Sequence, residues 1–361
     1  MQKLTQNKII LDLGKLNAKQ SGLGEYGLKF GETISNRSKE FNEKFNLKFY
    51  FFLPKKESGI FGDNVKYINR KHIFKLFNPM IQKFDIWHSL NQFCKVKPSP
   101  FSKNSITTIH DLNFLYMEND EIIKKLILKH TKLLKRTNYH ISISEFVKKD
   151  IIDNIPYKIN PKVIYNGVSN LIGFKQSKHK DFDYTKPFFF HISRLATNKN
   201  PESILRVSKL IPNFDFVIAG DLHHPHSNYL IEYCKSNNLT NVKFFHYISE
   251  EEKAWFYANC KGFIFPSLHE GFGMPIIEAM YFGKPVFVSN LSCLPEITST
   301  YGYYFTDFLE ENMKNVILNG LNDFELNNRS KSVSEYAENF SWNNCIDNHI
   351  KYYNEIIQLS K

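Results

Sequence analysis

Short apolar runs alternate with helical patterns along almost the whole chain, and this alternation limits the fold more than any other feature. Apolar runs of strand length joined through helices are typical of parallel sheets, in which a helix connects each strand to the next. The sequence therefore predicts an α/β protein. The expected strands are residues 8–13, 47–53, 65–68, 85–88, 105–109, 140–144 and 162–165, then 187–192, 214–219, 242–245, 262–266 and 285–288.

The length of the chain indicates two domains, because 361 residues exceed the usual size of a single core. The stretch 173–186 is polar and charged with almost no periodicity, and we place the linker there. We expect Rossmann-like domains over residues 1–175 and 186–340, followed by a final helix within 341–361. Such domains bind ligands at the carboxyl ends of their strands, and two of them would face each other across a cleft.

Composition excludes several classes of protein. The net charge of +11 would attract phosphate-bearing partners, but no zinc-finger, homeodomain or RNA-recognition pattern is present, so nucleic acid is not an expected partner. Five widely spaced cysteines without a Cys-x-x-Cys pair argue against disulfides and a zinc site. The chain has no membrane-spanning apolar run and no apolar leader, so we expect a cytoplasmic location.

The most informative motif runs from Pro266 to Pro285. It follows an expected strand and opens a helix, and its first part contains Gly271-Phe272-Gly273-Met274. Two glycines permit a tight turn, and the free N–H groups of a helix start form a ready anion site. Glu270 precedes the turn, and Glu278 lies four residues beyond Met274, about 6 Å along the helix axis. Since carboxylates suit hydroxyl groups, a diphosphate at the helix start would place its sugar near Glu270 and its ribose near Glu278.

Two further strand ends carry polar candidates. Arg194 and Lys199 follow strand 187–192, where a guanidinium and an ammonium can neutralise a diphosphate. His110 follows strand 105–109, which places it at the ligand-binding end of the first domain. Gly22 and Gly24 belong to a formal G-x-G-x-x-G, but they lie too far beyond the first strand for an NAD site. A phosphate- or acceptor-facing loop remains the expectation there.

Three other patterns suggest metal or membrane binding and are weaker. Asp181 and Asp183 form an Asp-x-Asp that lies in the charged linker rather than at a strand end. Residues 223–226 contain three histidines, His223, His224 and His226, which are expected to be solvated. Helix 121–136 has a basic face and an apolar face; core packing is the favoured interpretation and membrane binding the alternative. No metal site is therefore predicted.

These motifs resemble the retaining GT-B-fold transferases of glycosyltransferase family 4. The resemblance implies that Glu270 contacts the donor sugar, that Glu278 contacts the ribose, and that Arg194 and Lys199 hold the diphosphate. It further implies that His110 lies near the sugar, that Gly22 and Gly24 lie near the donor phosphates, and that the C-terminal helix crosses back to the first domain.

Arg194 and Lys199 at a strand end, the helix start nearby and the lack of a credible Asp-x-Asp cluster predict a metal-independent transferase without a cofactor. It would move a hexose from GDP-mannose or a UDP-hexose, with retention, to a glycan or lipid-linked acceptor in surface polysaccharide biosynthesis, such as that of lipopolysaccharide. The +11 charge adds an expected peripheral association with anionic membrane at the inner face of the cell membrane. A sugar-nucleotide epimerase and a catalytically silent sugar-nucleotide-binding subunit remain as alternatives.

Overall fold

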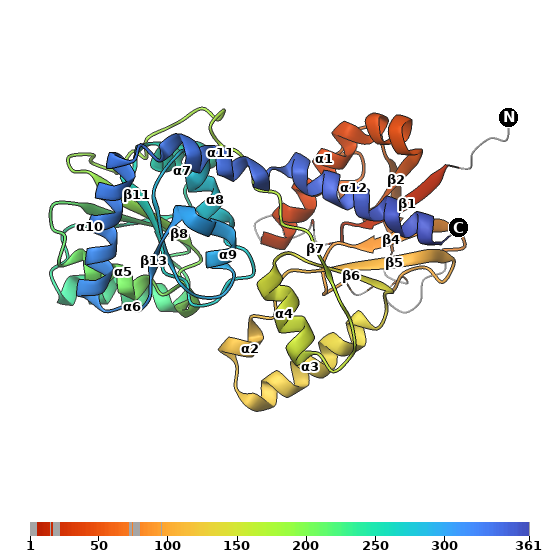
Figure 1. Ribbon diagram of the computed structural model, residues 1–361, viewed down its shortest axis with the longest axis horizontal. Helices are drawn as coiled ribbons and strands as arrows, with labels where there is room; N and C mark the ends of the chain where they lie inside the picture. The colour runs from red at the N-terminus through yellow and green to blue at the C-terminus, as the bar shows by residue number, and fades with distance from the viewer. Residues whose placement is uncertain are drawn as a thin grey trace. The chain divides into compact units, whose positions relative to one another are not determined.

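The computed structural model describes residues 6–14, 16, 22–71, 74, 80–94 and 96–360. The chain folds into two compact units (Figure 1). Unit 1 contains Met1–Gly167 together with Trp342–Lys361, and unit 2 contains Val168–Ser341. The chain thus leaves unit 1 once and returns to it with its last helix.

Unit 1 is built on a seven-stranded parallel sheet with the order β3-β2-β1-β4-β5-β6-β7. In register, Ile9 of β1 lies beside Phe49 of β2 and Ile86 of β4. All seven strands expected in this half are present. The strands are β1 (Asn7–Asp12), β2 (Leu47–Pro54), β3 (Lys66–Arg70), β4 (Phe84–Ser89), β5 (Ser102–Ile109), β6 (Tyr139–Ser142) and β7 (Lys162–Val163).

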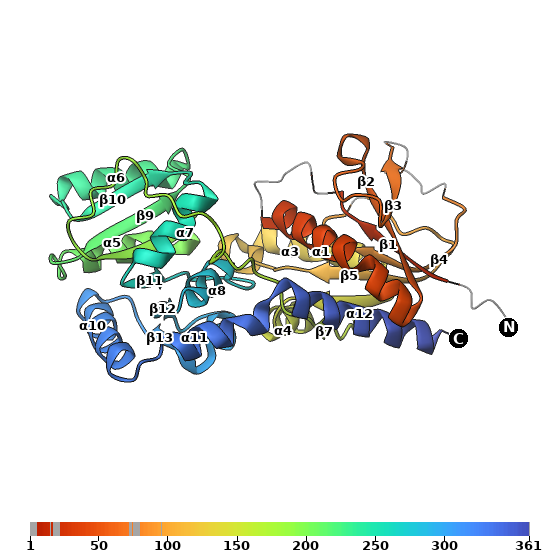
Figure 2. The ribbon, with the colours of Figure 1, turned by 90° about the horizontal axis from the view of Figure 1, so that it is seen from above.

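Two apolar layers enclose this sheet. Successive side chains of β1 point to opposite faces, so Ile9 and Leu11 join one buried cluster while Ile10 joins another. The first cluster is covered by α1 and α12, which lie side by side across the sheet in both views (Figures 1 and 2). The helices of unit 1 are α1 (Gly22–Phe45), α2 (Phe114–Met117), α3 (Asp120–Leu134), α4 (Glu145–Asn154) and α12 (Trp342–Leu359).

Unit 2 repeats the architecture with a six-stranded parallel sheet of order β10-β9-β8-β11-β12-β13. Five of these strands match the expected ones, and β13 is additional. The strands are β8 (Phe188–Ser193), β9 (Asp215–Gly220), β10 (Val242–His246), β11 (Gly262–Phe265), β12 (Val286–Ser289) and β13 (Gly302–Phe305). The helices are α5 (Pro201–Ser208), α6 (Pro225–Ser236), α7 (Glu250–Asn259), α8 (Met274–Tyr281), α9 (Leu294–Thr298), α10 (Glu310–Leu326) and α11 (Ser330–Ala337).

The connection between the units differs from the expected linker. The chain passes from unit 1 to unit 2 after Gly167, so residues 173–186 belong to unit 2. Phe182, in the middle of this charged stretch, is buried against Phe188, Phe245 and Phe256. Tyr184 also packs against Phe188, so two aromatic side chains tie the stretch to the sheet although most of its other residues are polar.

No helix in the described part of the chain combines the length and the hydropathy that a membrane span requires.

Candidate functional site

The carboxyl ends of β8 and β11 form the point of unit 2 where the strand order reverses. From β8, the chain continues to β9 and β10 on one side and then crosses to β11, β12 and β13 on the other. Loops that leave neighbouring strands in opposite directions open a crevice, and open α/β sheets bind their ligands there. The loop after β8 contains Arg194 and Lys199, and the loop after β11 contains Glu270.

The loop after β8 has an unusual backbone. Leu195 and Asn200 adopt positive φ angles of 57° and 50°, with a short 3-10 helix, η4 (Thr197–Lys199), between them. Positive φ is uncommon outside glycine and concentrates at sites whose surroundings impose it. The surroundings here are the next loop, since the carbonyl oxygen of Asn198 accepts from Leu268 N at 2.8 Å and from Ser267 Oγ at 3.0 Å. The two loops are thereby fastened together.

Lys199 and Glu270 form the centre of the site. Lys199 Nζ lies 2.5 Å from Glu270 Oε1, and Ser267 Oγ donates to the same oxygen at 2.8 Å. The side chains of Lys199 and Glu270 are only 18% and 10% exposed, so the pair is largely withdrawn from solvent. Both donors converge on Oε1, which holds the carboxylate in one orientation and leaves Oε2 as the oxygen available to a hydroxyl group.

The turn into α8 has the geometry that its glycines predicted. Gly273 has a φ of 94° and precedes Met274 without any side-chain cap on the helix. A Cβ atom at Gly273 would meet Ile276 and Leu294 at 3.0 Å, so both the backbone angle and the space favour glycine. Phe272 is buried and packs edge-on against Phe340. The packing of Gly273 and Phe272 therefore fixes the start of α8, and the helix dipole favours an anion at that position.

The loop after β12 supplies another contact to the site. The backbone N–H of Glu270 donates to Ser292 Oγ at 3.2 Å. Ser292 follows β12 and has a φ of 54°, so a third loop with a strained backbone meets the site. Sequence reasoning did not identify Ser267 or Ser292 as partners of Glu270, because nothing in their spacing distinguishes them from ordinary loop serines.

Glu278 occupies a different environment from Glu270. Lys253 Nζ lies 3.2 Å from its Oε1, and Tyr257 Oη donates to its Oε2 at 2.8 Å. Glu278 and Lys253 are 7% and 9% exposed, and Tyr257 is fully buried. Burial and the adjacent carboxylate of Glu278 raise the pKa of Tyr257 well above its ordinary value, so the hydroxyl keeps its proton and donates. Both of these partners come from α7 and were missed in the sequence.

Arg194 lies in the loop after β8 with an exposed side chain. Among the residues that the structure describes, it forms no ion pair with any carboxylate. A guanidinium without an internal partner keeps its donors for a ligand. Arg194 and Lys199 thus differ: one cation is uncommitted, and the other is already paired.

His191 supports the same edge of the sheet from within. Its Nδ1 lies 2.9 Å from the carbonyl oxygen of Ile264, and its Nε2 lies 2.9 Å from Ser193 Oγ. Burial, with a smaller effect of the Lys199 charge, lowers the pKa of His191 to about 4. The neutral ring joins β8 to β11 and is a structural element of the site.

In unit 1, His110 directly follows β5 and is buried. Its Nε2 lies 2.8 Å from the carbonyl oxygen of Leu90, which can only accept, so Nε2 carries the proton. Burial lowers the pKa of His110 and keeps the ring neutral, which leaves Nδ1 as a hydrogen-bond acceptor. The ring stands edge-on to Tyr26 of α1, with the two ring centroids 4.7 Å apart.

The glycine motif lies at the start of α1. Gly22 and Gly24 belong to the first turn of this helix. Gly22 is exposed and Gly24 is buried. Ser21, the first residue of the motif, lies outside the described residues. His110 and the two glycines belong to unit 1, whereas the pair of Lys199 and Glu270 belongs to unit 2.

The patterns that suggested a metal occupy ordinary positions. Among the residues that the structure describes, no three His, Cys, Asp or Glu side chains are grouped to hold a metal ion. His226 bonds to the carbonyl oxygen of Leu195 at 2.9 Å and to Glu202 at 2.5 Å, and His224 accepts from His226 N at the start of α6. These histidines organise a helix start beside the loop that contains Arg194.

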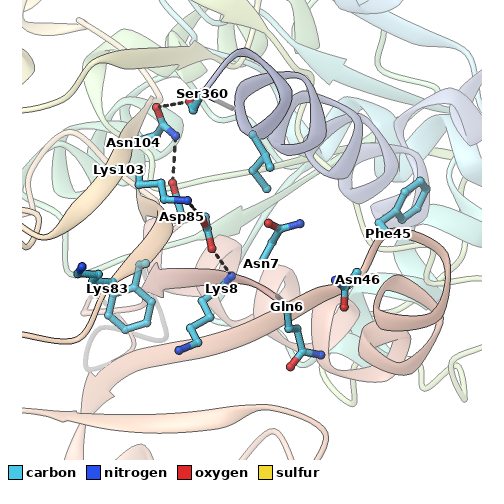
Figure 3. A pocket seen from close by; sticks show the side chains of 12 residues that line it. Gln6, Asn7, Lys8, Phe45, Asn46, Lys83, Asp85, Lys103, Asn104 and Ser360 are labelled. Atoms are coloured by element: carbon cyan, nitrogen blue, oxygen red, sulfur yellow. Dashed lines mark hydrogen bonds and ion pairs between the residues drawn. The ribbon is translucent and has the colours of Figure 1, made fainter. Parts of the chain in front are cut away.

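A separate cavity of about 760 Å³ lies in unit 1 (Figure 3). It is bounded by the first residues of β1, β4 and β5, so it lies at the amino edge of the sheet, opposite the edge of His110. Asp85 in this cavity pairs with Lys103 at 2.8 Å and accepts from the backbone N–H of Lys8 at 2.8 Å (Figure 3). Helices α1 and α12 also end beside this cavity.

The matching family model and two similar sequences are those of glycosyltransferases. Residues 174–340 match the family model described as glycosyl transferases group 1. An uncharacterised glycosyltransferase of Methanocaldococcus jannaschii is 27% identical over 281 residues, which cover 75% of this chain and 76% of that protein. The O-antigen chain mannosyltransferase RfbU of Salmonella typhimurium is 27% identical over 227 residues, covering 61% of this chain and 62% of the relative.

Solved structures share the whole fold at low identity. Sucrose-phosphate synthase from Thermosynechococcus elongatus superposes with a TM-score of 0.73 at 17% identity, covering 98% of this chain and 100% of that one. Anabaena HepE in complex with UDP superposes with a TM-score of 0.70 at 16% identity, covering 96% and 99%. The predicted fold class is confirmed: the chain has two parallel-sheet Rossmann-like units, as in GT-B proteins.

Proposed function

We propose that this chain, whose residues 174–340 match the family model of glycosyl transferases group 1, moves a hexose from a nucleoside diphosphate sugar to an acceptor hydroxyl. The observation that carries the proposal is the pair of Lys199 and Glu270 at the carboxyl ends of β8 and β11. A cation and a carboxylate held 2.5 Å apart beside a helix start suit a ligand with both phosphate and hydroxyl groups.

The chemistry requires departure of a diphosphate from an oxocarbenium-like sugar. Arg194, Lys199 and the start of α8 supply positive charge for the leaving group. The free Oε2 of Glu270 would accept from a sugar hydroxyl, and the neutral Nδ1 of His110 would do the same. Glu278 would bind the ribose. Gly22 and Gly24, in the first turn of α1, would approach the phosphates through their backbone.

The proposal extends to the stereochemistry, the metal requirement and the donor. Transfer would retain the configuration of the anomeric carbon, and it would need no divalent metal because protein cations neutralise the diphosphate. The donor would be GDP-mannose or a UDP-hexose. The mannosyltransferase activity named for RfbU supports GDP-mannose. The complex of HepE with UDP supports a UDP-hexose.

The acceptor would be a growing surface glycan or its lipid-linked precursor. The similarity to RfbU, an O-antigen chain mannosyltransferase, supports this class of acceptor. Association with the inner face of the cell membrane would bring the enzyme to such an acceptor. Helix α3 offers a surface for it, since four of its lysines are exposed and Leu128 is 59% exposed. The lysines are Lys124, Lys125, Lys129 and Lys132.

The proposal is tested by incubating the protein with GDP-mannose, UDP-glucose, UDP-galactose and UDP-N-acetylglucosamine, with and without a surface-glycan acceptor. Acceptor-dependent release of a nucleoside diphosphate is the expected result. Glu270→Ala should abolish transfer and leave nucleoside diphosphate binding nearly intact, whereas Glu278→Ala should weaken binding of the nucleotide. Equal loss of nucleotide affinity in both variants would contradict the division of roles.

A further inference from the structure

Helix α7 presents two side chains to Glu278 that neither the sequence motifs nor the family comparison identified. Lys253 Nζ lies 3.2 Å from one carboxylate oxygen, and Tyr257 Oη lies 2.8 Å from the other. Lys253 is also paired with Glu250 at 3.0 Å, one turn earlier on α7. Each oxygen of Glu278 therefore has one fixed donor, and the ammonium is held between two carboxylates.

We infer that Lys253 and Tyr257 are positioning residues of the nucleotide site, holding the carboxylate of Glu278 in the orientation that suits the two hydroxyl groups of a ribose. The inference rests on the proposed function. A carboxylate oxygen can accept two hydrogen bonds, so α7 takes one position on each oxygen of Glu278 and leaves one on each. Two acceptors on one rigid carboxylate match the two adjacent hydroxyls of a ribose.

Stability alone is a poor explanation for this arrangement. A buried ion pair stabilises a fold little or not at all relative to apolar side chains of the same size, because both charges lose their hydration. Here the pair is more than nine-tenths buried, and it lies one turn inside α8, whose start follows Gly273. A bare carboxylate at that position would repel a diphosphate at the helix start. Lys253 balances this charge without removing the acceptors.

The contribution of the ribose hydroxyls separates a positioning role from a structural one. A site built to bind hydroxyl groups rejects an analogue that lacks them, because its polar groups are then left unpaired. If Lys253 and Tyr257 act through Glu278 on the ribose, their removal should weaken binding of a ribonucleotide. Binding of the 2′,3′-dideoxy analogue should hardly change. General damage to the fold would weaken both ligands alike.

The experiment is isothermal titration of the full chain with UDP, GDP, CDP and ADP, followed by the 2′,3′-dideoxy analogue of whichever binds most tightly. We expect the unchanged protein to prefer the ribonucleotide by about tenfold or more. Tyr257→Phe and Lys253→Met should each raise the Kd of the ribonucleotide about tenfold, on the scale of one lost hydrogen bond to a charged group. The Kd of the analogue should change less than about twofold, and Lys253→Arg should restore most of the ribonucleotide affinity.

Matched controls exist in the same unit. Tyr303 donates to Asp323 at 2.5 Å, and Lys261 pairs with Glu325 at 3.9 Å, so Tyr303→Phe and Lys261→Met remove the same groups elsewhere. Neither control should change the preference for the ribonucleotide. Equal weakening of both ligands by Tyr257→Phe, or unchanged affinities, would overturn the positioning role. If the unchanged protein bound no nucleoside diphosphate at all, the proposed function itself would fall, and the role with it.

Discussion

Replacing Lys199 by methionine tests whether the charge pair at the centre of the site is as tightly coupled as its geometry indicates. The substitution keeps the length of the side chain and removes the ammonium that lies 2.5 Å from Glu270 Oε1. Glu270 would retain the hydrogen bond from Ser267 at 2.8 Å but would keep an uncompensated charge in a largely buried place.

The burial of the pair sets how much stability the Lys199→Met substitution should remove. Removing one partner of a fully buried pair costs about 3–5 kcal/mol, whereas exposed pairs contribute about 0–1 kcal/mol. The Lys199 side chain is 18% exposed and Ser267 remains as a donor, so we expect Lys199→Met to lower the free energy of unfolding by about 2–3 kcal/mol. In a unit of this size, 1 kcal/mol shifts the Tm by about 2–4 °C, which predicts a fall of about 4–12 °C.

The assay measures the Tm of the ligand-free protein by calorimetry, and it includes two further variants. Lys261→Met removes an equivalent ammonium from a pair whose side chains are 52% and 72% exposed, and it should leave the Tm within about 2 °C. Lys199→Met combined with Glu270→Gln should be more stable than Lys199→Met alone, because the unpaired charge is gone while an acceptor for Ser267 remains. Tight coupling of the pair is contradicted if Lys199→Met lowers the Tm no more than Lys261→Met does. It is also contradicted if adding Glu270→Gln to Lys199→Met does not raise the Tm.

Three other measurements address the proposed mechanism, the membrane surface and the pH dependence. Arg194→Ala should lower turnover about a hundredfold, as for loss of one preorganised donor, and EDTA should leave the activity of the unchanged protein intact; activity that vanished in EDTA and returned with Mn²⁺ or Mg²⁺ would contradict the metal-independent mechanism. The protein should float with anionic liposomes at low salt and not at high salt, and reversing the four lysine charges of α3 should abolish flotation; equal flotation of that variant would exclude α3 as the binding surface. Because the pKa of His191 is about 4 when folded and 6.5 when unfolded, the unfolded chain binds its proton first, and unit 2 should lose up to about 3 kcal/mol as the pH falls from 6.5 to 4. In His191→Asn the Tm should therefore decrease less steeply over this range, and a slope equal to that of the unchanged protein would argue against the shift.

Local patterns in the sequence were sufficient for the strands and for the turn that begins α8. Twelve expected apolar runs correspond to β1–β12, because a buried strand of a parallel sheet requires apolar side chains on both faces. Gly271 and Gly273 predict a turn into a helix because glycine backbone preferences permit it. The strand β13 (Gly302–Phe305) escaped prediction.

The boundary between the units could not be read from composition. Residues 173–186 are mostly polar or charged, yet Phe182 is buried in unit 2 and Tyr184 packs beside it, and these aromatic contacts outweigh the polarity of the neighbouring residues. The membrane surface, the metal independence and the roles assigned to Gly22, Gly24 and His110 remain predictions.

The sequence by itself determined that the chain alternates strands and helices, that Arg194, Lys199 and Glu270 lie in loops after strands, and that Glu278 lies in the helix that follows Gly273. Those properties depend on residues near one another in the chain. Only the tertiary structure decided which side chains meet. Lys199 is 71 residues from Glu270, and Lys253 is 25 residues from Glu278. These pairs exist because the strand order places β8 beside β11 and because α7 packs against α8. Helical spacing links only residues three or four apart, so no local pattern could reveal them.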